Sequence, residues 1–315
     1  MSEAAPRISI ALCTYNGERF LAQQLESLLA QDHQPLELVA CDDGSTDDTW
    51  AILQRYAPRF GQAQLVRNTS NLGVHANFEQ ALLACKGEWI APCDQDDIWE
   101  PHKLSRLLAE AGDALLVYGD SALIDAQGQS LGERVSDRLP MIAGSHPLAF
   151  AFGNCVSGHA ALLRRSLVEI ATPIPTGLYY DEWLAFVASS LGTIVYVDEP
   201  LVQFRQHGGN LTQFTRAADA RRKSPLEAHT IKTPKLAALA GLPGPQQALL
   251  SRLLGLWRGR EQQWLSPSLM ALTFRHHDEL RLIAPRSTRL SAWRFALKHL
   301  WGLRAKMLMW RARRR

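Results

Sequence analysis

Carboxylates gather at three places in the sequence, each beside a predicted secondary-structure element. The segments 42–48 and 94–97 follow short apolar runs, and the pair Asp181-Glu182 opens a helical pattern. In an extended backbone, the side chains of Asp94 and Asp96 point to the same side. Mg²⁺ takes oxygen ligands, usually one or two carboxylates together with substrate phosphates. The 94–97 segment therefore predicts a site for a divalent cation, Mg²⁺ or Mn²⁺, and a diphosphate.

Each of these three segments also has an explanation that needs no ligand. The Ser, Thr and Asp side chains of residues 45–48 can cap the following helix by accepting bonds from its free N–H groups. Residues 94–97 can form a solvated acidic turn, and acidic residues at 181–182 suit the first turn of a helix because of its dipole. Capping alone leaves Asp42 and Asp43 unexplained.

The elements that must position these carboxylates alternate along the first part of the chain. Short apolar runs predict strands over 8–14, 37–41, 64–67, 88–93 and 114–118. Amphipathic segments between them predict helices over 18–30, 47–56, 75–85 and 101–110. This alternation predicts an α/β fold with a doubly wound, mostly parallel sheet. Ligands of such sheets bind outside the carboxyl ends of the strands, so we expect segments 42–48 and 94–97 to meet at one crevice.

The pattern changes after residue 118. Residues 192–204 predict a hairpin around Asp198-Glu199-Pro200, and strand signals end near residue 215. From residue 236 onward the chain is rich in Leu, Ala, Arg and Trp at helical spacing. We expect one α/β unit over 1–215 and a helical region over 216–315. The first strand is followed by Cys-Thr-Tyr-Asn-Gly rather than by a P-loop or a GxGxxG turn, which disfavours nucleotide triphosphatases and nicotinamide dehydrogenases.

Composition and charge narrow the class of protein. The chain has 315 residues, of which 46% are hydrophobic and 21% charged, as in globular proteins. Eleven Lys/Arg and no Asp/Glu lie between Arg281 and Arg315, whereas the remainder carries 23 basic and 31 acidic residues. This distribution predicts an anionic partner at one end and disfavours a nucleic-acid binder. Five cysteines without a CxxC pair, and no signal-peptide or membrane-spanning pattern, predict a cytoplasmic protein, soluble or peripheral.

Residues 290–315 have the pattern of a basic amphipathic helix. Lys and Arg residues occupy one face and end in the run 311–315, which predicts attachment to the anionic inner leaflet of a membrane. A helix packed on the protein body, or a dimer contact, is the alternative. The apolar face would contain Leu290, Trp293, Leu297, Leu300, Trp301, Met307 and Leu308.

Five short motifs follow one another along the chain: Cys-Thr-Tyr-Asn-Gly at 13–17, Asp-Asp-Gly-Ser-Thr-Asp at 42–47, Asn-Leu-Gly-Val at 71–74, Asp-Gln-Asp-Asp-Ile-Trp at 94–99 and Asp-Glu-Trp-Leu-Ala at 181–185. In these motifs and their order the sequence, from Ile8 to about Asn210, resembles glycosyltransferase family 2, the inverting nucleotide-sugar transferases of GT-A fold. The form of the fourth motif, followed by Arg-Gln-His-Gly-Gly-Asn at 205–210, resembles the bacterial surface-polysaccharide or rhamnosyltransferase-like branch.

The resemblance implies a role for each matched residue. The catalytic base would be Asp181 or, alternatively, Glu182. Asp42 or Asp43 would accept the N3–H of a uracil or thymine base. The metal would be held by Asp96, with Asp94 and His207. The nucleotide-sugar would be bound by Thr14, Tyr15, Asn16, Asp42, Asp43, Asn71, Asp94 and Arg205.

The implied activity is inverting, metal-dependent transfer of a sugar from a UDP- or dTDP-sugar. The acceptor would be a hydroxyl of a lipid-linked cell-surface glycan such as O-antigen or capsule. Residues 1–118 would bind the nucleotide-sugar, and 119–215 would supply the acceptor side and the base. Two alternatives are a sugar-nucleotidyltransferase, although residues 15–18 lack its Gly-rich basic loop, and a catalytically silent nucleotide-binding scaffold at the membrane.

Overall fold

A single mixed sheet forms one end of the molecule. The computed structural model describes residues 7–209, 224–284 and 290–312. The sheet runs in the order β3-β2-β1-β4-β8-β6-β9-β5, with β7 paired to β6. Its strands are β1 (Ile8–Thr14), β2 (Leu36–Asp42), β3 (Gln62–Arg67), β4 (Trp89–Cys93), β5 (Ile98–Trp99), β6 (Leu116–Ile124), β7 (Ser130–Arg134), β8 (Ala161–Arg164) and β9 (Ile194–Arg205).

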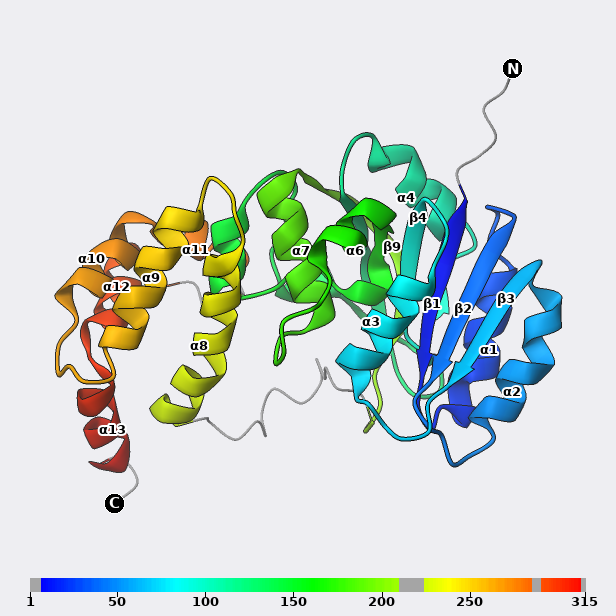
Figure 1. The fold of residues 1–315 in the computed structure, drawn as a ribbon, viewed down its shortest axis with the longest axis horizontal. Coiled ribbons are helices and arrows are strands. Elements are labelled where there is room, and N and C mark those ends of the chain that lie inside the picture. Colours follow the sequence, from blue (N-terminus) through cyan, green and yellow to red (C-terminus); the bar gives the residue numbers. More distant parts are fainter. Residues whose placement is uncertain (1–6, 210–223, 285–289, 313–315) are drawn as a thin grey trace.

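The helices fall into two groups. The first group is associated with the sheet, and the second forms the far end of the molecule (Figure 1). The first contains α1 (Glu18–Leu29), α2 (Thr49–Tyr56), α3 (Val74–Ala84), α4 (Lys103–Ala111), α5 (Val135–Arg138), α6 (Arg165–Ala171) and α7 (Tyr180–Leu191). The second contains α8 (Pro225–Gly241), α9 (Gln247–Gly259), α10 (Pro267–Arg275), α11 (His277–Leu280), α12 (Ala292–Leu300) and α13 (Leu303–Ala312).

Both faces of the sheet are buried, which explains the continuous apolar runs. Along β1, Ile8, Ile10 and Leu12 pack into a core with α1 and α4. The alternate residues Ala11 and Cys13 belong to a second core with α3, α6 and α7. The α/β fold class is therefore confirmed. The four strands β3, β2, β1 and β4 are parallel, as predicted, whereas β8 is antiparallel to both of its neighbours.

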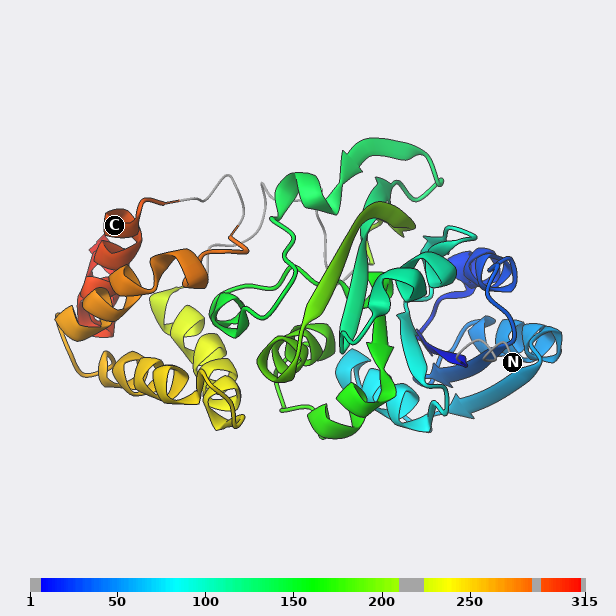
Figure 2. The same ribbon diagram turned by 90° about the horizontal axis from the view of Figure 1, so that it is seen from above.

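The helical region continues the second core. Figures 1 and 2 show α6 and α7 between the sheet and helices α8–α13. Leu184 of α7, Leu236 of α8, Trp257 of α9 and Phe295 of α12 belong to one buried apolar cluster. The predicted boundary near residue 215 lies outside the described residues, but the packing on its two sides is continuous.

The predicted hairpin over 192–204 is wrong. Residues 194–205 form one strand, β9, which runs parallel to β6. Gly119 pairs with Val197 and Asp120 pairs with Pro200, so the turn-like residues 198–199 form a bulge in the strand. A bulge tolerates proline and polar residues without reversing the chain.

The C-terminal segment differs in one respect from the predicted amphipathic helix. It forms two helices, because Trp301 is extended and Gly302 lies against the carbonyl of Gln263, where a Cβ has no room. Within residues 7–209, 224–284 and 290–312, no helix combines the length and apolar character needed to cross a bilayer. All five cysteines are free and buried.

Candidate functional site

The loops after β1, β2 and β4 meet at one edge of the sheet. Thr14 lies opposite Asp42 in the β1–β2 register, and Leu12 lies opposite Cys93 in the β1–β4 register. The strands therefore end at nearly the same level. The N–H of Tyr15 donates to Gln95 Oε1 at 2.8 Å, and Gln95 Nε2 donates to the Tyr15 carbonyl at 3.0 Å. This reciprocal pair joins the loop after β1 to residues 94–97, which we call the acidic loop.

A cavity of about 690 Å³ opens beside these loops, and residues of both halves of the α/β unit line it. Residues of helix α7 and of the segment 154–159 complete the lining. Four predicted site residues, Asn16, Asp42, Arg205 and His207, are not part of this lining. The predicted residues that do line it are Thr14, Tyr15, Asp43, Asn71, Asp94, Asp96, Asp181 and Glu182.

Asp42 has a structural position instead of the predicted place beside the nucleotide base. Its buried carboxylate accepts bonds from Thr14 Oγ1 at 3.0 Å and from the N–H of Ser45 at 3.1 Å. Arg67 Nε lies 3.5 Å from Oδ2 of the same carboxylate. Asn16 likewise joins two loops, since its Oδ1 accepts the N–H of Thr46 at 2.9 Å. Both residues therefore stabilise the loops beside the cavity.

Asp43 faces the cavity and organises the third motif. Its Oδ1 accepts the N–H of Leu72 at 2.8 Å, and its Oδ2 accepts the N–H of Gly73 at 2.9 Å. Gly73 has a positive φ of 87°, a conformation that glycine adopts readily. Asn68 Nδ2 donates a third bond at 2.9 Å. The carboxylate therefore fixes the loop that carries Asn71.

Arg205 is buried against the backbone of residues 96–97. The residue is only 1% exposed, and its Nε donates to the Asp96 carbonyl at 2.8 Å. Its N–H donates to Asp97 Oδ1 at 3.0 Å, and its Nη2 donates to Gln23 at 2.7 Å. The guanidinium therefore holds the backbone of the acidic loop, and its binding of the nucleotide-sugar stays a prediction.

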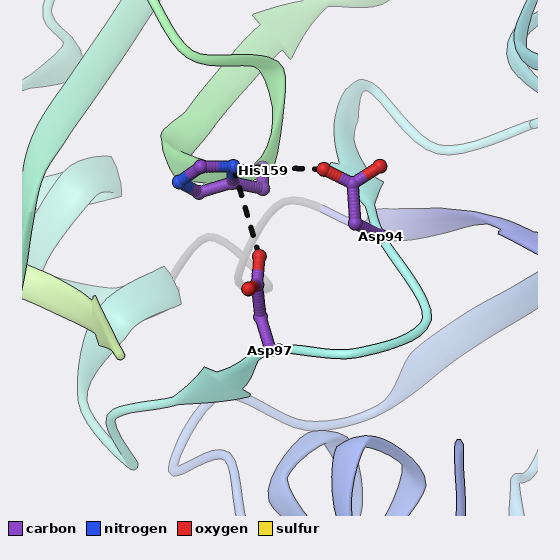
Figure 3. Close-up of side chains that lie close together, drawn as sticks. All are labelled: Asp94, Asp97 and His159. Atoms are coloured by element: carbon purple, nitrogen blue, oxygen red, sulfur yellow. Dashed lines mark ion pairs between the residues drawn. The ribbon is translucent and has the colours of Figure 1, made fainter. Parts of the chain in front are cut away.

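Two groups of side chains, each made of a histidine and carboxylates of the acidic loop, could take part in cation binding. His207 Nε2 lies 2.8 Å from Asp96 Oδ2, so two of the predicted ligands are in contact. Figure 3 shows the second group, in which His159 Nδ1 lies 3.5 Å from Asp94 Oδ2 and 3.6 Å from Asp97 Oδ2. The ligand atoms of this second group all lie within 4.8 Å of one another. Carboxylate and imidazole groups of this kind suit Mn²⁺ or Mg²⁺ with mainly oxygen ligands.

The second group differs from the first in burial and charge. Asp97 is fully buried, and burial raises the pKa of its carboxyl. Burial lowers the pKa of the His159 imidazole, but the carboxylates of Asp97 and Asp94 reverse this effect and raise it above its ordinary value. Ser121 Oγ holds the other ring nitrogen of His159 at 3.0 Å. His159 thus acts as a charge partner behind the acidic loop.

Helix α7 presents Asp181 to the cavity in its first turn. Burial raises the pKa of the Asp181 carboxyl to about 7, although the N–H of Glu182 donates to it at 2.7 Å. Glu182 is also in the lining, but it forms an ion pair with Lys235 of α8. The pKa of Lys235 is lowered by burial and raised again by Glu182. Glu182, the alternative to Asp181 as the predicted base, therefore has a buried cationic partner.

The residue before Asp181 is fixed by close packing. The Tyr180 ring stacks on Phe78 with centroids 4.1 Å apart and planes at 21°. On its other side, a Cβ at Gly158 would lie 2.6 Å from Tyr180 Cζ. Only glycine at position 158 leaves this ring in place, so the two neighbours hold the start of α7.

Sequence reasoning missed three of the residues at the site: Asp97 as a buried group, His159 and Lys235. Asp97 belongs to the acidic motif, so its position was visible but not its burial. His159 is the only histidine within the largely apolar stretch 150–163, which is a weak signal. Lys235 is distant in sequence from Glu182, and no motif marks it.

Two solved structures of similar fold were determined with nucleotide-sugars bound. S. aureus TarS 1–349 in complex with UDP-GlcNAc is 16% identical, with 87% of this chain and 81% of that chain covered and a TM-score of 0.59. The mannosyltransferase PcManGT of Pyrobaculum calidifontis, in complex with GDP-Man and Mn²⁺, is 18% identical, with 99% and 87% covered and a TM-score of 0.50. At these low identities the similarities show the fold, which is the GT-A fold of these structures.

The family follows from the sequence. The glycosyl transferase family 2 model matches residues 9–170, and the chain belongs to this family. An uncharacterized glycosyltransferase of Nostoc is 29% identical over 65% of this chain and 66% of its own length. The putative glycosyltransferase EpsH of Bacillus subtilis is 27% identical over 66% of this chain and 63% of its own length.

Other relatives match over a shorter span. An uncharacterized protein of Mycobacterium tuberculosis is 42% identical over 31% of this chain and only 30% of its own length. The chain thus spans about two thirds of the length of some curated relatives and less than a third of others. Residues 9–170 form a glycosyl transferase family 2 domain.

Proposed function

We propose that this enzyme is an inverting, metal-dependent glycosyltransferase that moves a sugar from a UDP- or dTDP-sugar to a hydroxyl of a lipid-linked cell-surface glycan, such as O-antigen or capsule. The observation that carries the proposal is one cavity whose lining includes Asp94, Asp96 and Asp181. Its volume suits a small-molecule ligand. The names of two relatives, EpsE of Bacillus subtilis and the chondroitin synthase of Escherichia coli, favour a polysaccharide product.

Asp181 is the proposed catalytic base. A sugar hydroxyl is a weak nucleophile at neutral pH, so a neighbouring group must accept its proton during attack. A base works best when its pKa lies near the working pH, and burial brings the pKa of Asp181 to about 7. Glu182 is less suited, because its carboxylate is already engaged in an ion pair with Lys235 of α8.

One displacement step accounts for inversion. The acceptor oxygen forms a bond to the anomeric carbon from the face opposite the diphosphate, and the bond from that carbon to the diphosphate oxygen breaks. The proton of the acceptor hydroxyl passes to Asp181, and the nucleoside diphosphate leaves with the bonding electron pair. No covalent sugar–enzyme intermediate is required, since one base on the acceptor side suffices.

Asp94 and Asp96 are the proposed cation ligands, with His207 in support. A cation that also contacts a diphosphate must face the cavity, and these two carboxylates line it whereas Asp97 does not. Asp97 and His159 then hold Asp94 in place. A bound divalent cation would neutralise the charge of the leaving nucleoside diphosphate.

Cation binding is testable without the sugar reaction. Asp96→Asn should weaken Mn²⁺ binding at least tenfold in equilibrium dialysis, whereas Asp113→Asn, an exposed residue at the end of α4, should not change it. Equal affinity in Asp96→Asn and the wild type would contradict this ligand set.

The proposed attachment to a membrane rests on the surface of α12 and α13. Helix α12 packs through Phe295 and Ala296, so it is attached to the body as well. Trp293 and Leu308 nevertheless remain 60% and 59% exposed, which leaves an apolar surface flanked by cations. We propose attachment to the inner face of the cytoplasmic membrane. The remaining exposed members of the predicted apolar face are Leu297 and Trp301.

Vesicle binding checks the attachment. Trp293→Ser with Leu297→Ser leaves the buried side of α12 intact and should abolish sedimentation with phosphatidylglycerol vesicles. A matched change on an exposed apolar residue far away, Ile170→Ser of α6, should leave sedimentation unchanged. Undiminished sedimentation of the double variant would refute this surface as the attachment site.

The transfer reaction itself is tested by Asp181→Asn. This variant should bind the nucleotide-sugar in the presence of Mn²⁺ as the wild type does, measured by thermal shift. Its kcat should fall by about 10²–10⁴-fold, the usual contribution of a general base. Glu182→Gln is the matched control and should retain most of the turnover at its own pH optimum. Unchanged turnover of Asp181→Asn would remove Asp181 as the base.

A further inference from the structure

Basic residues of four segments of the helical region lie near one another, where α8 packs against α9 and α13. They are Lys232 of α8, Arg260 directly after α9, the exposed Lys298 of α12 and Lys306 of α13, and we call them the cation cluster. Among the residues that the structure describes, none of the four forms an ion pair with a carboxylate. Arg260 is only 3% exposed, and its buried Nε has no hydrogen-bond partner in the described part of the chain.

Aromatic rings connect the members of the cation cluster. The Arg260 guanidinium lies 4.3 Å from the centroid of the Trp257 ring, and Lys232 Nζ lies 5.2 Å from that of Phe152. These two rings are themselves 5.8 Å apart. The neighbouring carboxylate of Glu261 is paired with His229 at 2.7 Å. Two of the four cations thus lie on aromatic rings, and none of the four has an ion-pair partner in the described part of the chain.

Burial and the neighbouring cations both lower the pKa values of lysines in the cluster. Burial, followed by the neighbouring cations, lowers the pKa of Lys232 to about 8 and that of Lys306 to about 7. Burial alone lowers the pKa of Arg260 to about 10. A buried cation without a partner is costly, and a chain gains stability when an anion occupies such a place.

The cation cluster adjoins the cavity of the reaction. Lys232 and Lys235 are one helical turn apart on α8, and Lys235 contacts Glu182 in the cavity lining. Phe152, beneath Lys232, is two residues before Asn154, which also lines the cavity. On its other side the cluster is built by α12 and α13, which carry the exposed apolar residues described above. The cluster thus lies between the cavity and the apolar surface.

We propose that the cation cluster binds the diphosphate of a lipid-linked acceptor, with the acceptor sugar directed into the cavity and the lipid along the apolar surface. A diphosphate offers several oxygens to four cations, and such charge-assisted bonds are strong and short. The identity of this ligand rests on the proposed function, whereas the binding of a phosphate-type anion rests on the cluster alone.

The experiment measures anion binding with the full chain in the presence of EDTA, so that binding through a divalent cation is removed. The probes are inorganic pyrophosphate and farnesyl diphosphate, with farnesol as the uncharged control. Lys232→Met and Lys306→Met remove one cation each, and Arg258→Met, an exposed residue of α9, is the matched control. In each cluster variant, the Kd for farnesyl diphosphate should rise at least tenfold, while Arg258→Met should bind as the wild type does.

Stability supplies a readout that a merely structural role would not give. Without ligand, Lys306→Met should have the same or a higher Tm than the wild type, because it relieves repulsion. With farnesyl diphosphate, its Tm increase should be smaller than that of the wild type. A lower Tm without ligand together with an undiminished ligand-induced increase would overturn the proposal.

Further outcomes separate the possible sources of the anion. If phosphatidylglycerol vesicles lose binding to Lys306→Met while the Kd for farnesyl diphosphate is unchanged, the cluster is a headgroup site and the proposal is wrong. Equal loss of pyrophosphate and farnesyl diphosphate binding, with no binding of farnesol, supports it. If no nucleotide-sugar is turned over but the cluster variants still lose farnesyl diphosphate, the proposed function fails and the anion site stands.

Discussion

The ion pair between Glu182 and Lys235 should control the pH dependence of the reaction. Both side chains lie beside Asp181, whose pKa burial raises to about 7. Below this pH the base is protonated, so kcat of the wild type should fall as pH decreases, to about one tenth of its plateau at pH 6. The groups that face Asp181 are Glu182 and Asp94, which raise its pKa, and His159, which lowers it.

Removing one member of the pair should move this dependence in opposite directions. Lys235→Met leaves the Glu182 charge uncompensated, which raises the pKa of Asp181. Glu182→Gln leaves the Lys235 charge, which lowers it. A unit charge about 10 Å away at an effective dielectric constant of about 20 contributes about 1.7 kcal/mol, or about one pKa unit. The acid side of the profile should therefore move up by about one unit in the first variant and down by about one in the second.

The assay is kcat as a function of pH from 5 to 9 at saturating donor and acceptor. At pH 6 the two variants should differ by about fiftyfold, because a base with a pKa of about 8 is about 1% ionised there and one with a pKa of about 6 is about half ionised. Their plateaus at high pH should be similar. The double variant Glu182→Gln with Lys235→Met removes both charges and should return the profile close to that of the wild type. Shifts of both single variants in the same direction, or no shift in either, would refute the assignment of Asp181 as the titrating base.

Three further predictions concern other parts of the site. Asp181→Asn should raise the Tm at pH 8 and leave it unchanged at pH 4. The reason is that a carboxyl whose pKa is raised to about 7 stabilises the fold only when protonated, and this stability is lost as pH rises through 7. Calorimetry that shows no gain in Tm at pH 8 would contradict this prediction. Gly158→Ala crowds the Tyr180 ring and should lower kcat at least tenfold with little change in donor affinity; unaltered kinetics would show that the ring can move. Asp43→Asn replaces an acceptor of two backbone N–H bonds with a group that can accept at only one oxygen, so the donor KM should rise at least tenfold; an unchanged KM would separate the 71–73 loop from donor binding.

The parallel part of the sheet could be predicted because its signals are local. The run 8–14 is apolar throughout and ends in polar residues, and it forms β1 with the predicted bounds. The second half could not be predicted to the same extent. Strand β5 has two residues and β8 has four, too few for a period to show. The polar triplet 198–200 indicated a turn, but pairing with β6 keeps it within one strand.

The site follows the same division. The motifs predicted which segments meet, but not which of two adjacent residues faces the cavity. Asp42 and Asp43 differ only in the side of the strand end on which they lie, and this depends on the register with β1. Lys235 became visible only through tertiary packing, because its contact with Glu182 depends on how α8 lies against α7.

The contact between α8 and α7 has a consequence for protein engineering. Chimaeras that join this catalytic sheet to the helical region of another transferase would change the ionic surroundings of the base along with the acceptor. Unless the grafted region carries a cation at the position of Lys235, the chimaera would have its optimum shifted toward alkaline conditions, whatever substrate it was built to accept.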